Sequence, residues 1–390
     1  MFTDDFCTAA RCSSIFPHSA GAADRSEGYV TSSSPCGEGE ISVGGGCGSM
    51  YSLPPPPLRL FVVVLLLRIY CAYFWLNEIF PTSSYDFISL SGYGRLLHTT
   101  RSKVRTGHNT STSSLPPCPL LPFQSSFQTG NYFQPNIPYF WSLEDIELDE
   151  KAASDEMKIQ VGGSWRPTDC NPVHHVALII PFRDRGIQLK KFLLYMHPFL
   201  QLQLISYKIF VIEQTDELPF NRGKLFNIGY NISAWDDPSL ECFIFHDVDL
   251  LPESLSNVYS CAKLPRHMSA VTNTFRYTLL YPQLFGGATS MTRETFDSVN
   301  GFSNNFYGWG GEDDDFFLRL TNKGIQPIRL SPTLSSYRML PHKKEAANLE
   351  RLDVLKKGHI QHDKDGMNNL KFTLLNHISG PLYTLIQVKL

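Results

Sequence analysis

The sequence predicts an α/β fold built around a mostly parallel sheet. Three continuous apolar runs have the length and texture of strands buried on both faces: VALIIPF (176–182), KIFVIEQ (208–214) and ECFIFHDVD (241–249). Helix-like stretches at 186–203 and 220–233 separate them, an alternation typical of β-α-β units. Polar clusters close each run, at 181–185, 213–214 and 247–249. Because ligands of such sheets bind at the carboxyl ends of the strands, we expect a functional site there.

Composition excludes two classes of protein. The chain has 390 residues, of which 18% are charged and 42% hydrophobic, with a formal net charge of −3. A disordered chain needs low hydrophobicity and high net charge, so we expect a folded protein. A nucleic-acid-binding protein needs a basic excess to contact phosphates, so we expect no nucleic-acid partner.

Residues 60–76, LFVVVLLLRIYCAYFWL, carry one charge, Arg68, and predict a transmembrane span. The alternative is a buried core helix. No small-residue cleavage site follows, which favours an uncleaved signal anchor. Residues 1–59 then form a cytoplasmic tail, whose Gly/Ser-rich first part, 1–49, is predicted to be a disordered leader. Our hypothesis is that Met50 is the true start and that residues 1–49 are an upstream extension.

The segment 77–114 is rich in Ser, Thr and Gly and shows no clear periodicity, so it predicts a stem between the anchor and a globular part. Asn109 begins one N-glycosylation sequon in this stem, and Asn231 begins a second one further along. Sequons also occur by chance. Together with an anchor they favour a lumenal C-terminal part.

Asp247 and Asp249 close the third apolar run. Residues i and i+2 of a strand point to the same side, so both carboxylates are expected to face one site. Carboxylates suit Mg²⁺ or Mn²⁺, which share their coordination with substrate phosphates. The alternative is an ordinary turn, in which Asp is common. Met339 and His342 are a possible second pair of ligands, although a lone His is more often structural.

Arginines follow the strands in a pattern that suits an anionic ligand. Arg183 and Arg185 come after the first run, and Arg222 follows Phe220, whose ring offers a stacking surface for a base. Surface salt bridges are the alternative.

Residues 308–315, GWGGEDDD, combine three glycines, a Trp and four carboxylates. The glycines predict a segment that changes conformation, and crowded carboxylates predict raised pKa values that suit a general base. The alternative is the acidic first turn of a helix at 312–323, which the helix dipole favours. Both interpretations are compatible.

Together these segments resemble the β-1,4-galactosyltransferase family, glycosyltransferase family 7. The resemblance covers about 165–390 and is carried by IPFRDR (180–185), FNRGKLFNIGY (220–230), CFIFHDVDLLP (242–252), LPRHMS (264–269), LFGGATSM (284–291), NGFSNNFYGWGGEDDDFFLRL (300–320), RMLPH (338–342) and PLYT (381–384). It implies a GT-A fold and a Golgi type II membrane enzyme with a lumenal catalytic domain. Such an enzyme transfers a hexose with inversion from a UDP-sugar to the 4-hydroxyl of terminal GlcNAc, using Mn²⁺.

The resemblance also implies roles for individual residues. The metal ligands are Asp249, Met339 and His342, and the catalytic base is Asp313. The residues that contact the nucleotide sugar are Pro181, Phe182, Arg183, Arg185, Phe220, Asn221, Arg222, Val248, Asp249, Leu284, Trp309 and His342. The residues that contact the acceptor are Gly311, Glu312, Asp313, Asp314 and Arg351. The segment before Arg351 is shorter than in the vertebrate enzymes, so this last correspondence is the least direct.

Two disulfides follow from the resemblance, Cys118–Cys170 and Cys242–Cys261. The string SLPPCP before Cys118 also looks family-like and implies a catalytic domain over 115–390.

One residue departs from the vertebrate pattern. Those enzymes carry Tyr immediately before the FGG motif, and here the position is Leu284. In the family this side chain lies near the 2-position of the donor sugar, and members that use UDP-GalNAc have an aliphatic residue there. The sequence therefore predicts UDP-GalNAc as a donor, alone or beside UDP-galactose. A catalytically silent glycan-binding relative is the alternative function.

Overall fold

The computed structural model describes residues 87–101, 115–119, 133, 140–343, 348–358 and 360–390. All of them lie in one compact unit, Val64–Leu390. The predicted leader, tail, anchor at 60–76 and sequon at Asn109 lie outside the described residues. Within the described ranges, no helix is both long and apolar enough to cross a bilayer.

The described elements are, in chain order, β1 (Phe87–Ile88), α2 (Leu90–Arg101), α3 (Glu150–Met157), β2 (Ser164–Trp165), β3 (His175–Phe182), α4 (Gly186–Leu202), β4 (Ser206–Gln214), α5 (Arg222–Asp236), β5 (Cys242–His246), β6 (Leu250–Pro252), β7 (Arg266–His267), β8 (Val271–Thr272), the 3-10 turn η3 (Asn273–Phe275), β9 (Ala288–Thr292), α6 (Arg293–Ser298), α7 (Glu312–Asn322), β10 (Arg329–Leu330), β11 (Ser336–Met339), α8 (Arg351–Gly358), η4 (Met367–Asn369), β12 (Thr373–Ser379) and β13 (Thr384–Lys389).

The main sheet has the strand order β12-β13-β4-β3-β5-β9-β7, with β2 also paired to β4. Its centre, β13-β4-β3-β5, is parallel. Strands β12, β9, β7 and β2 pair antiparallel. The predicted α/β fold is therefore present, but the sheet is mixed rather than mostly parallel. Continuous apolar runs mark only strands buried on both faces, and the added strands, such as ATSMT and TLLNHIS, lack them.

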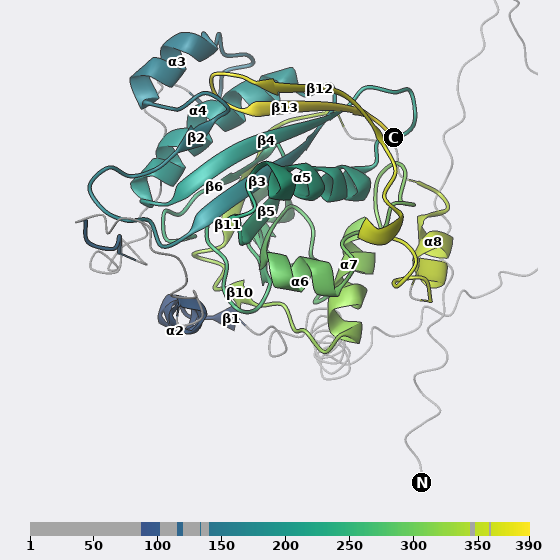
Figure 1. Cartoon of the computed structure of the whole chain (residues 1–390). Coiled ribbons are helices and arrows are strands. Elements are labelled where there is room, and N and C mark those ends of the chain that lie inside the picture. Colours follow the sequence, from purple (N-terminus) through teal and green to yellow (C-terminus); the bar gives the residue numbers. More distant parts are fainter. Residues whose placement is uncertain (1–86, 102–114, 120–132, 134–139, 344–347, 359) are drawn as a thin grey trace, which may run out of the picture. The chain divides into compact units, whose positions relative to one another are not determined.

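Helices α4 and α5 cover opposite faces of this sheet (Figure 1). Along β3, Val176, Leu178 and Ile180 pack with α4, whereas Ala177 and Ile179 pack with α5. This alternation explains why the run contains no polar residue. In α5, a Cβ at Gly229 would lie 2.3 Å from Ile179 Cγ2, so only glycine lets the helix approach the sheet this closely.

A second sheet, β6-β11-β8, is much smaller. Its middle strand, β11, runs antiparallel to β6, with Met339 opposite Leu250. This register brings the end of β11 beside Asp249, the residue that precedes β6. Two segments far apart in the sequence therefore meet next to the carboxyl end of β5.

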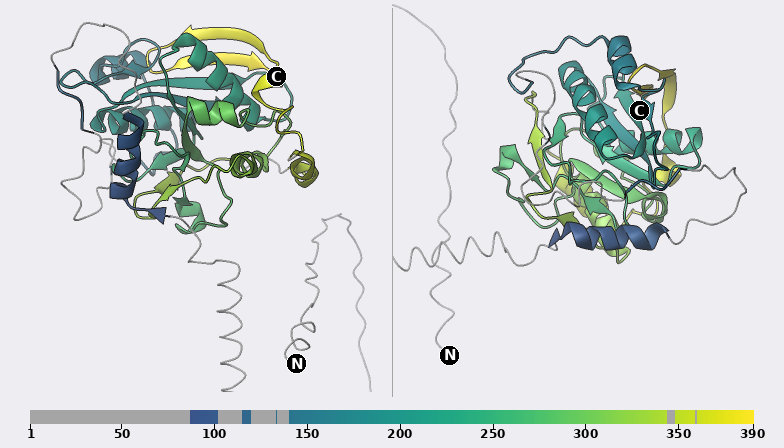
Figure 2. Two further views of the ribbon diagram at one scale, coloured as in Figure 1. Left: turned by 60° about the horizontal axis from the view of Figure 1, so that its bottom comes forward. Right: turned by 90° about the vertical axis from the view of Figure 1, so that its left-hand side faces the viewer.

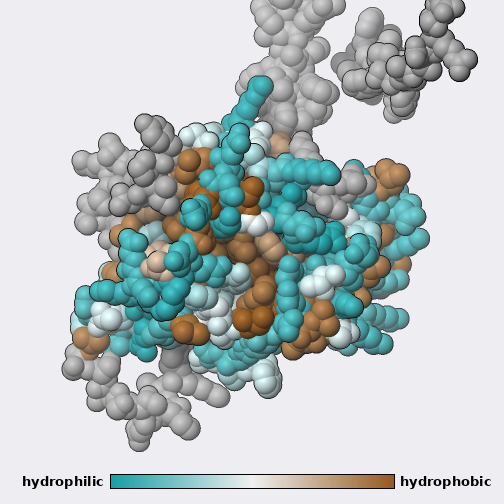
Figure 3. All heavy atoms as spheres, turned by 90° about the horizontal axis from the view of Figure 1, so that it is seen from above, coloured by the Kyte–Doolittle hydropathy of each residue, from teal (hydrophilic) through white to brown (hydrophobic). Residues whose placement is uncertain are grey.

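The edge strand β12 lies at the top of Figure 1 and exposes three apolar side chains, those of Leu374, Leu375 and Ile378. Figure 3 looks down on this side and shows apolar residues interspersed in a mostly hydrophilic surface.

Residues 87–101, which lie in the predicted stem over 77–114, form a strand and a helix. Strand β1 pairs with β10, and α2 buries Leu90, Tyr93 and Leu97 against a cluster that includes Val258 and Leu330. Figure 2 shows α2 on the opposite side of this unit from β12 and β13. The three apolar residues follow helical spacing, but the neighbouring Ser, Gly and Thr residues obscure it in the sequence.

Tyr93 is the centre of this contact. Its hydroxyl donates to the Ser260 carbonyl at 2.7 Å, and the guanidinium carbon of the fully buried Arg266 lies 4.6 Å from its ring centroid. A buried charge over an aromatic face is stabilised more strongly than an exposed one. Residues 87–101 are therefore part of the folded domain.

We expect Tyr93→Ala to lower the free energy of unfolding by roughly 3 kcal/mol, because it leaves a cavity and removes the ring from Arg266. Chemical denaturation measures this. Arg95→Ala, on the exposed side of the same helix, is the control and is expected to change stability by less than about 0.5 kcal/mol. Equal effects of the two variants would contradict the docking of α2.

Candidate active site

The candidate site lies where the sequence places it, at the carboxyl ends of β3, β4 and β5. Arg183 follows β3 and donates from Nη1 to the Leu218 carbonyl at 2.7 Å, and its guanidinium carbon is 5.4 Å from the Phe220 ring centroid. Arg222 is the first residue of α5 and contacts Asp247, which follows β5. The polar clusters after all three strands are thus brought together.

The guanidinium of Arg222 joins three other segments. Its Nε donates to Asp247 Oδ1 at 2.6 Å, its Nη1 to Glu312 Oε1 at 3.3 Å, and its Nη2 to the Gly287 carbonyl at 3.0 Å. Burial lowers the pKa of Arg222, but the two carboxylates outweigh this effect and raise it. Burial raises the pKa of Glu312, and Arg222 opposes that rise. Burial also raises the pKa of Asp247 to about 6, and Arg222 again opposes the rise. The charge on Arg222 therefore favours the ionised form of both acidic partners.

Asp247 and Asp249 lie close enough for the charge of Asp249 to raise the pKa of Asp247, but they have different partners. Strand β5 ends at His246, so neither residue belongs to the strand. Asp247 contacts Arg222, whereas Asp249 Oδ2 lies 2.9 Å from His342 Nδ1. The Leu340 amide also donates to the Asp249 carbonyl at 2.7 Å, which fixes the segment 339–342 beside this carboxylate.

Asp249, Met339 and His342 form a candidate metal site. The hydrogen bond with Asp249 raises the pKa of His342. Met339 is held by its backbone amide, which donates to Asn273 Oδ1 at 2.8 Å, and its Sδ accepts from Thr274 Oγ1 at 3.8 Å.

Among the described residues, no group of three His, Cys, Asp or Glu side chains could hold a metal ion. The third protein ligand of this site would therefore be the thioether of Met339. One carboxylate and one imidazole fit a divalent ion such as Mn²⁺, with positions left for the oxygens of a diphosphate.

The four carboxylates of EDDD open α7, as the helical interpretation predicts, and each has different surroundings. Glu312 pairs with Arg222. Asp314 Oδ1 accepts from the Tyr281 hydroxyl at 3.0 Å. Asp315 is fully buried and pairs with Arg319 and His362, which gives it a structural role.

Asp313 faces the FGG segment. A Cβ at Gly286 would lie 2.7 Å from Asp313 Oδ2, so the glycine allows this approach. Burial raises the pKa of Asp313 to about 6, and the negative charge of Glu312 adds to the effect. The pKa of Asp314 is also raised to about 6, first by burial and then by Asp313. The sequence predicted raised values from mutual repulsion, but burial contributes more.

The loop before α7 requires its glycines. Gly308, Gly310 and Gly311 have φ values of +78°, +102° and +97°, in the left-handed region. The loop presents Trp309 with 61% of its surface exposed. Arg351 joins it, since its guanidinium carbon lies 6.0 Å from the Trp309 ring centroid.

The remaining predicted donor contacts differ in their surroundings. Arg185 donates to the Lys343 carbonyl at 2.6 Å, beside the candidate metal site. Pro181 and Val248 are buried, and Phe182 and Phe220 are half-buried. Asn221 is fully buried. Its Oδ1 accepts from the Lys224 amide at 2.9 Å and caps α5, while its Nδ2 donates to the Asn304 carbonyl at 2.8 Å.

The structure adds residues that the sequence interpretation did not assign to the site. Tyr281 contacts Asp314, Gly286 adjoins Asp313, and the carbonyl of Gly287 accepts from Arg222. Only the FGG motif gave a signal for the two glycines, and nothing in the sequence distinguishes Tyr281 from other aromatic residues. Leu284 is half-buried, and its carbonyl accepts from Arg329 Nη2 at 2.8 Å.

Both predicted cysteine pairs are bonded, Cys118 to Cys170 and Cys242 to Cys261. The second pair begins at the first residue of β5. Asn231 is exposed on α5, while the hydroxyl of its sequon partner Ser233 is buried and donates to the Tyr230 carbonyl.

Two family models match consecutive parts of the chain. Residues 139–262 match the N-terminal region of glycosyl transferase group 7, and residues 266–343 match the N-terminal domain of galactosyltransferase. These ranges contain most of the site, including Arg222, Asp249 and Asp313. The fold and the two matching family models thus define a glycosyltransferase with an α/β domain.

Individual relatives narrow the classification from glycosyltransferases in general to one family. It is 38% identical to β-1,4-galactosyltransferase 4 of Cricetulus griseus, over 80% of this chain and 86% of the relative. It is 35% identical to the human β-1,4-galactosyltransferase 1, over 97% and 88%, and 40% identical to the β-1,4-galactosyltransferase 6 of Rattus norvegicus, over 70% of each. The chain belongs to the β-1,4-galactosyltransferase family and is a hexosyltransferase.

A solved structure, the catalytic domain of Drosophila β-1,4-galactosyltransferase 7 in complex with xylobiose, is 29% identical, with a TM-score of 0.49 over 56% of this chain and 94% of that one. A mutant of the same enzyme was solved with manganese, UDP-Gal and xylobiose, at 28% identity and a TM-score of 0.47.

Proposed function

We propose that this protein is a Mn²⁺-dependent inverting enzyme that transfers galactose, or GalNAc, from a UDP-sugar to the 4-hydroxyl of terminal GlcNAc on glycoprotein or glycolipid glycans. One observation carries the proposal. Asp313, a carboxylate whose pKa is raised, lies in the same site as Asp249, Met339 and His342, the three side chains that suit a metal ion. The family to which the chain belongs makes this combination informative.

Asp249, Met339 and His342 would hold Mn²⁺, which would supply a positive charge to offset the charge of the leaving UDP. Arg183 and Arg185 bind the diphosphate, and Phe220 lies beside Arg183 as a surface for the base. Pro181, Phe182, Asn221, Arg222 and Val248 complete the predicted donor contacts. The inward-turned side chain of Asn221 favours a positioning role, since it holds the start of α5 and hence Arg222.

Asp313 serves as the general base. It accepts the proton of the acceptor 4-hydroxyl while that oxygen attacks the anomeric carbon from the face opposite to UDP, which inverts the configuration. Burial of Asp313 raises its pKa toward neutrality, which makes it a better proton acceptor than an exposed Asp. A single carboxylate suffices because the charge on UDP is met by the metal and the arginines.

Acceptor binding falls to the first turn of α7 and the Trp309 loop. Glu312 Oε2 is buried, and among the described residues no group donates a hydrogen bond to it. A sugar hydroxyl would satisfy this atom. Gly311, Asp314 and Arg351 border the same place, and the exposed Trp309 ring offers a face for the sugar. Rotation about the left-handed glycines would close this loop over the donor and exclude water.

The predicted setting is the Golgi lumen, with the protein held as a single-pass type II membrane protein by residues 60–76. The family membership and the two disulfides support an oxidising compartment. Glycosylation at Asn109 and at the exposed Asn231 belongs to the same proposal.

The proposal is tested with UDP-Gal and UDP-GalNAc, a GlcNAc acceptor and Mn²⁺. We expect turnover that a chelator abolishes and that Asp249→Asn reduces by at least about 100-fold, because a metal ligand is lost. Asp363→Asn, an exposed surface carboxylate, is the matched control. A wild type that is inert with every UDP-sugar would instead support the catalytically silent glycan-binding relative.

The pKa of Asp313 predicts a pH dependence. The base acts when ionised, so kcat/KM is expected to fall as the pH is lowered through about 6. Asp313→Asn is expected to lose roughly 10²- to 10⁴-fold in rate. Asp315→Asn is the control variant. It weakens the buried contacts with Arg319 and His362, but kcat/KM is still expected to fall as the pH is lowered through about 6. An acid limb near pH 4, the ordinary range of an Asp, would argue against Asp313.

Leu284 supports UDP-GalNAc as a donor. Leu284 lies two residues before Gly286, and Gly286 adjoins the proposed base Asp313. Leu284 is therefore near the proposed reaction centre. A leucine lacks the hydroxyl of the vertebrate tyrosine and leaves more room at the sugar 2-position.

We expect Leu284→Tyr to shift the ratio of kcat/KM values from UDP-GalNAc toward UDP-Gal by roughly 10- to 100-fold, the scale of discrimination that pocket shape supplies. Leu284→Met keeps an apolar side chain of similar volume without a hydroxyl and is expected to preserve the ratio. If the wild type strongly prefers UDP-Gal and Leu284→Tyr changes nothing, galactose alone is the donor.

A further inference from the structure

The backbone that carries Leu284 is held by a buried cation. Arg329 on β10 is 6% exposed, and its Nη2 donates to the Pro282 carbonyl at 2.7 Å and to the Leu284 carbonyl at 2.8 Å. Both carbonyls belong to a segment before β9 that is neither helix nor strand. Such a segment lacks a ladder of backbone hydrogen bonds, so its conformation depends on contacts of this kind.

His267 extends the contact to a third carbonyl. Arg329 Nε donates to His267 Nδ1 at 3.1 Å, and His267 Nε2 lies 2.9 Å from the Gly286 carbonyl. A guanidinium only donates and a carbonyl only accepts, so Nδ1 accepts and Nε2 carries the proton. Burial, together with the charge of Arg329, lowers the pKa of His267 and keeps the ring neutral, as this arrangement requires. Arg329 thus holds every second carbonyl from 282 to 286, two directly and one through His267.

The segment 282–286 borders the proposed reaction centre. Gly286 adjoins Asp313, and Leu284 is the residue proposed to lie beside the 2-position of the donor sugar. Small displacements of groups that position a substrate cost large factors in rate or binding. The predicted contacts to the UDP part come instead from the end of β3 and the start of α5. The position of this segment should therefore affect the sugar of the donor rather than its nucleotide.

The strand that carries Arg329 is paired with a segment from the predicted stem. Strand β10 has two residues, and β1 lies beside it (Figure 1). Phe87 pairs with Arg329 itself and Ile88 with Leu330, in parallel. The backbone of Arg329 is therefore fixed in part by residues that precede the first disulfide.

Helix α2 supports the same arrangement through the neighbour of His267. Arg266 precedes His267 on β7 and is fully buried, with its guanidinium carbon 4.6 Å from the Tyr93 ring centroid. Its Nη2 donates to the Val258 carbonyl, whereas among the described residues its Nε and Nη1 have no hydrogen-bond partner. The Tyr93 ring therefore offsets part of the cost of burying this charge. Strand β1 and helix α2 thus reach β10 and β7 by separate contacts.

We propose that residues 87–101 are a positioning element for donor-sugar binding. Strand β1 and helix α2 hold Arg329 and the Arg266–His267 pair, and these in turn hold the backbone of 282–286. The inference rests on the proposed function, since it takes the sugar of a UDP-sugar as the ligand of this segment. The predicted stem then contributes to donor binding and does not serve only as a spacer.

The direct test is Arg329→Lys in the full chain. Lysine keeps the charge but cannot reach His267 and both carbonyls in one planar fork. We expect KM for UDP-Gal and UDP-GalNAc to rise about 10-fold, whereas the Kd of UDP, measured by calorimetry with Mn²⁺, stays within about 2-fold. Hydrogen exchange of the amides of 282–288, followed by mass spectrometry, is expected to become faster.

Arg293→Lys is the matched control. Arg293 also donates to two loop carbonyls, those of Pro238 and Leu240, but it follows Thr292, which pairs with Cys242 at the far end of β5 from Asp247. We expect this variant to leave both KM values and the exchange of 282–288 as in the wild type.

The contribution of 87–101 is tested by two substitutions of one residue. Tyr93→Leu removes the aromatic face from Arg266 but keeps an apolar side chain, and Tyr93→Phe keeps the ring. We expect Tyr93→Leu to raise KM for both UDP-sugars about 3-fold and to speed exchange at 282–288, and Tyr93→Phe to change neither. A variant that is merely less stable loses active protein, which lowers the apparent kcat at an unchanged KM.

Three results overturn the proposal. The first is an Arg329→Lys variant with unchanged KM for both donors or unchanged exchange at 282–288. The second is a loss of UDP affinity in that variant as large as the rise in KM. The third is a Tyr93→Leu variant that matches Tyr93→Phe in KM and exchange.

A failure of the proposed function is separable from a failure of this inference. If the wild type turns over no UDP-sugar, calorimetric titration with intact UDP-Gal and UDP-GalNAc decides. Weaker binding of a UDP-sugar to Arg329→Lys and Tyr93→Leu than to wild type, at unchanged UDP binding, supports the positioning role. Equal or undetectable binding of the UDP-sugars to all three proteins overturns it.

Discussion

The geometry of the candidate active site depends on one mostly buried cation, Arg222. Arg222 opens α5 and reaches the turn after β5 through Asp247, the first turn of α7 through Glu312 and the FGG segment through the Gly287 carbonyl. Removing one partner from such a cluster leaves an uncompensated buried charge, at a cost of several kcal/mol. The three segments come from distant parts of the sequence. Arg222 therefore fixes the donor side and the acceptor side of the site relative to each other.

The same cation sets the character of the carboxylates in α7. Four adjacent acidic residues would repel one another, but the helix N-terminus favours negative charge, Arg222 offsets Glu312, and Arg319 offsets Asp315. Asp313 lies between these pairs and has no such direct cation. Burial thus raises its pKa to about 6 without making it neutral at physiological pH. The EDDD motif thus combines a structural member, Asp315, which pairs with Arg319, with the proposed catalytic base, Asp313.

The sequence predicts the features that depend on local pattern. Strands β3, β4 and β5, helices α4 and α5 and the acidic start of α7 lie where the apolar runs and charges place them. Features that depend on packing between distant segments were missed. The antiparallel strands β9 and β12 carry no continuous apolar run, and α2 has only three apolar contacts within a Ser/Gly-rich stretch. Strand β5 ends at His246, before both Asp247 and Asp249, so strand alternation does not decide their partners, and element boundaries are the least readable part of a sequence.

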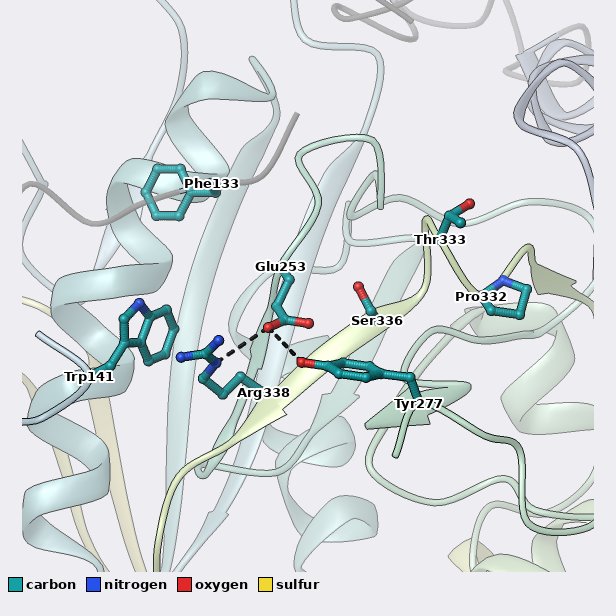
Figure 4. A pocket seen from close by; sticks show the side chains of 8 residues that line it. All are labelled: Phe133, Trp141, Glu253, Tyr277, Pro332, Thr333, Ser336 and Arg338. Carbon is teal, nitrogen blue, oxygen red and sulfur yellow. Dashed lines mark hydrogen bonds and ion pairs between the residues drawn. The ribbon is translucent and has the colours of Figure 1, made fainter. Parts of the chain in front are cut away.

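Strand β11 shows how little local structure is needed to couple distant parts of the molecule. Its residues Ser336 and Arg338 line a pocket together with Glu253 and Tyr277 (Figure 4). The two residues that alternate with them face the opposite side, where Tyr337 is buried and Met339 lies beside Asp249. A slip of one residue would exchange the two sets. The pairing of Met339 with Leu250 and the bond from the Leu340 amide to the Asp249 carbonyl prevent that slip. The contacts that fix the metal-competent side chain thus also fix the pocket, so the donor side and the pocket share a single strand register.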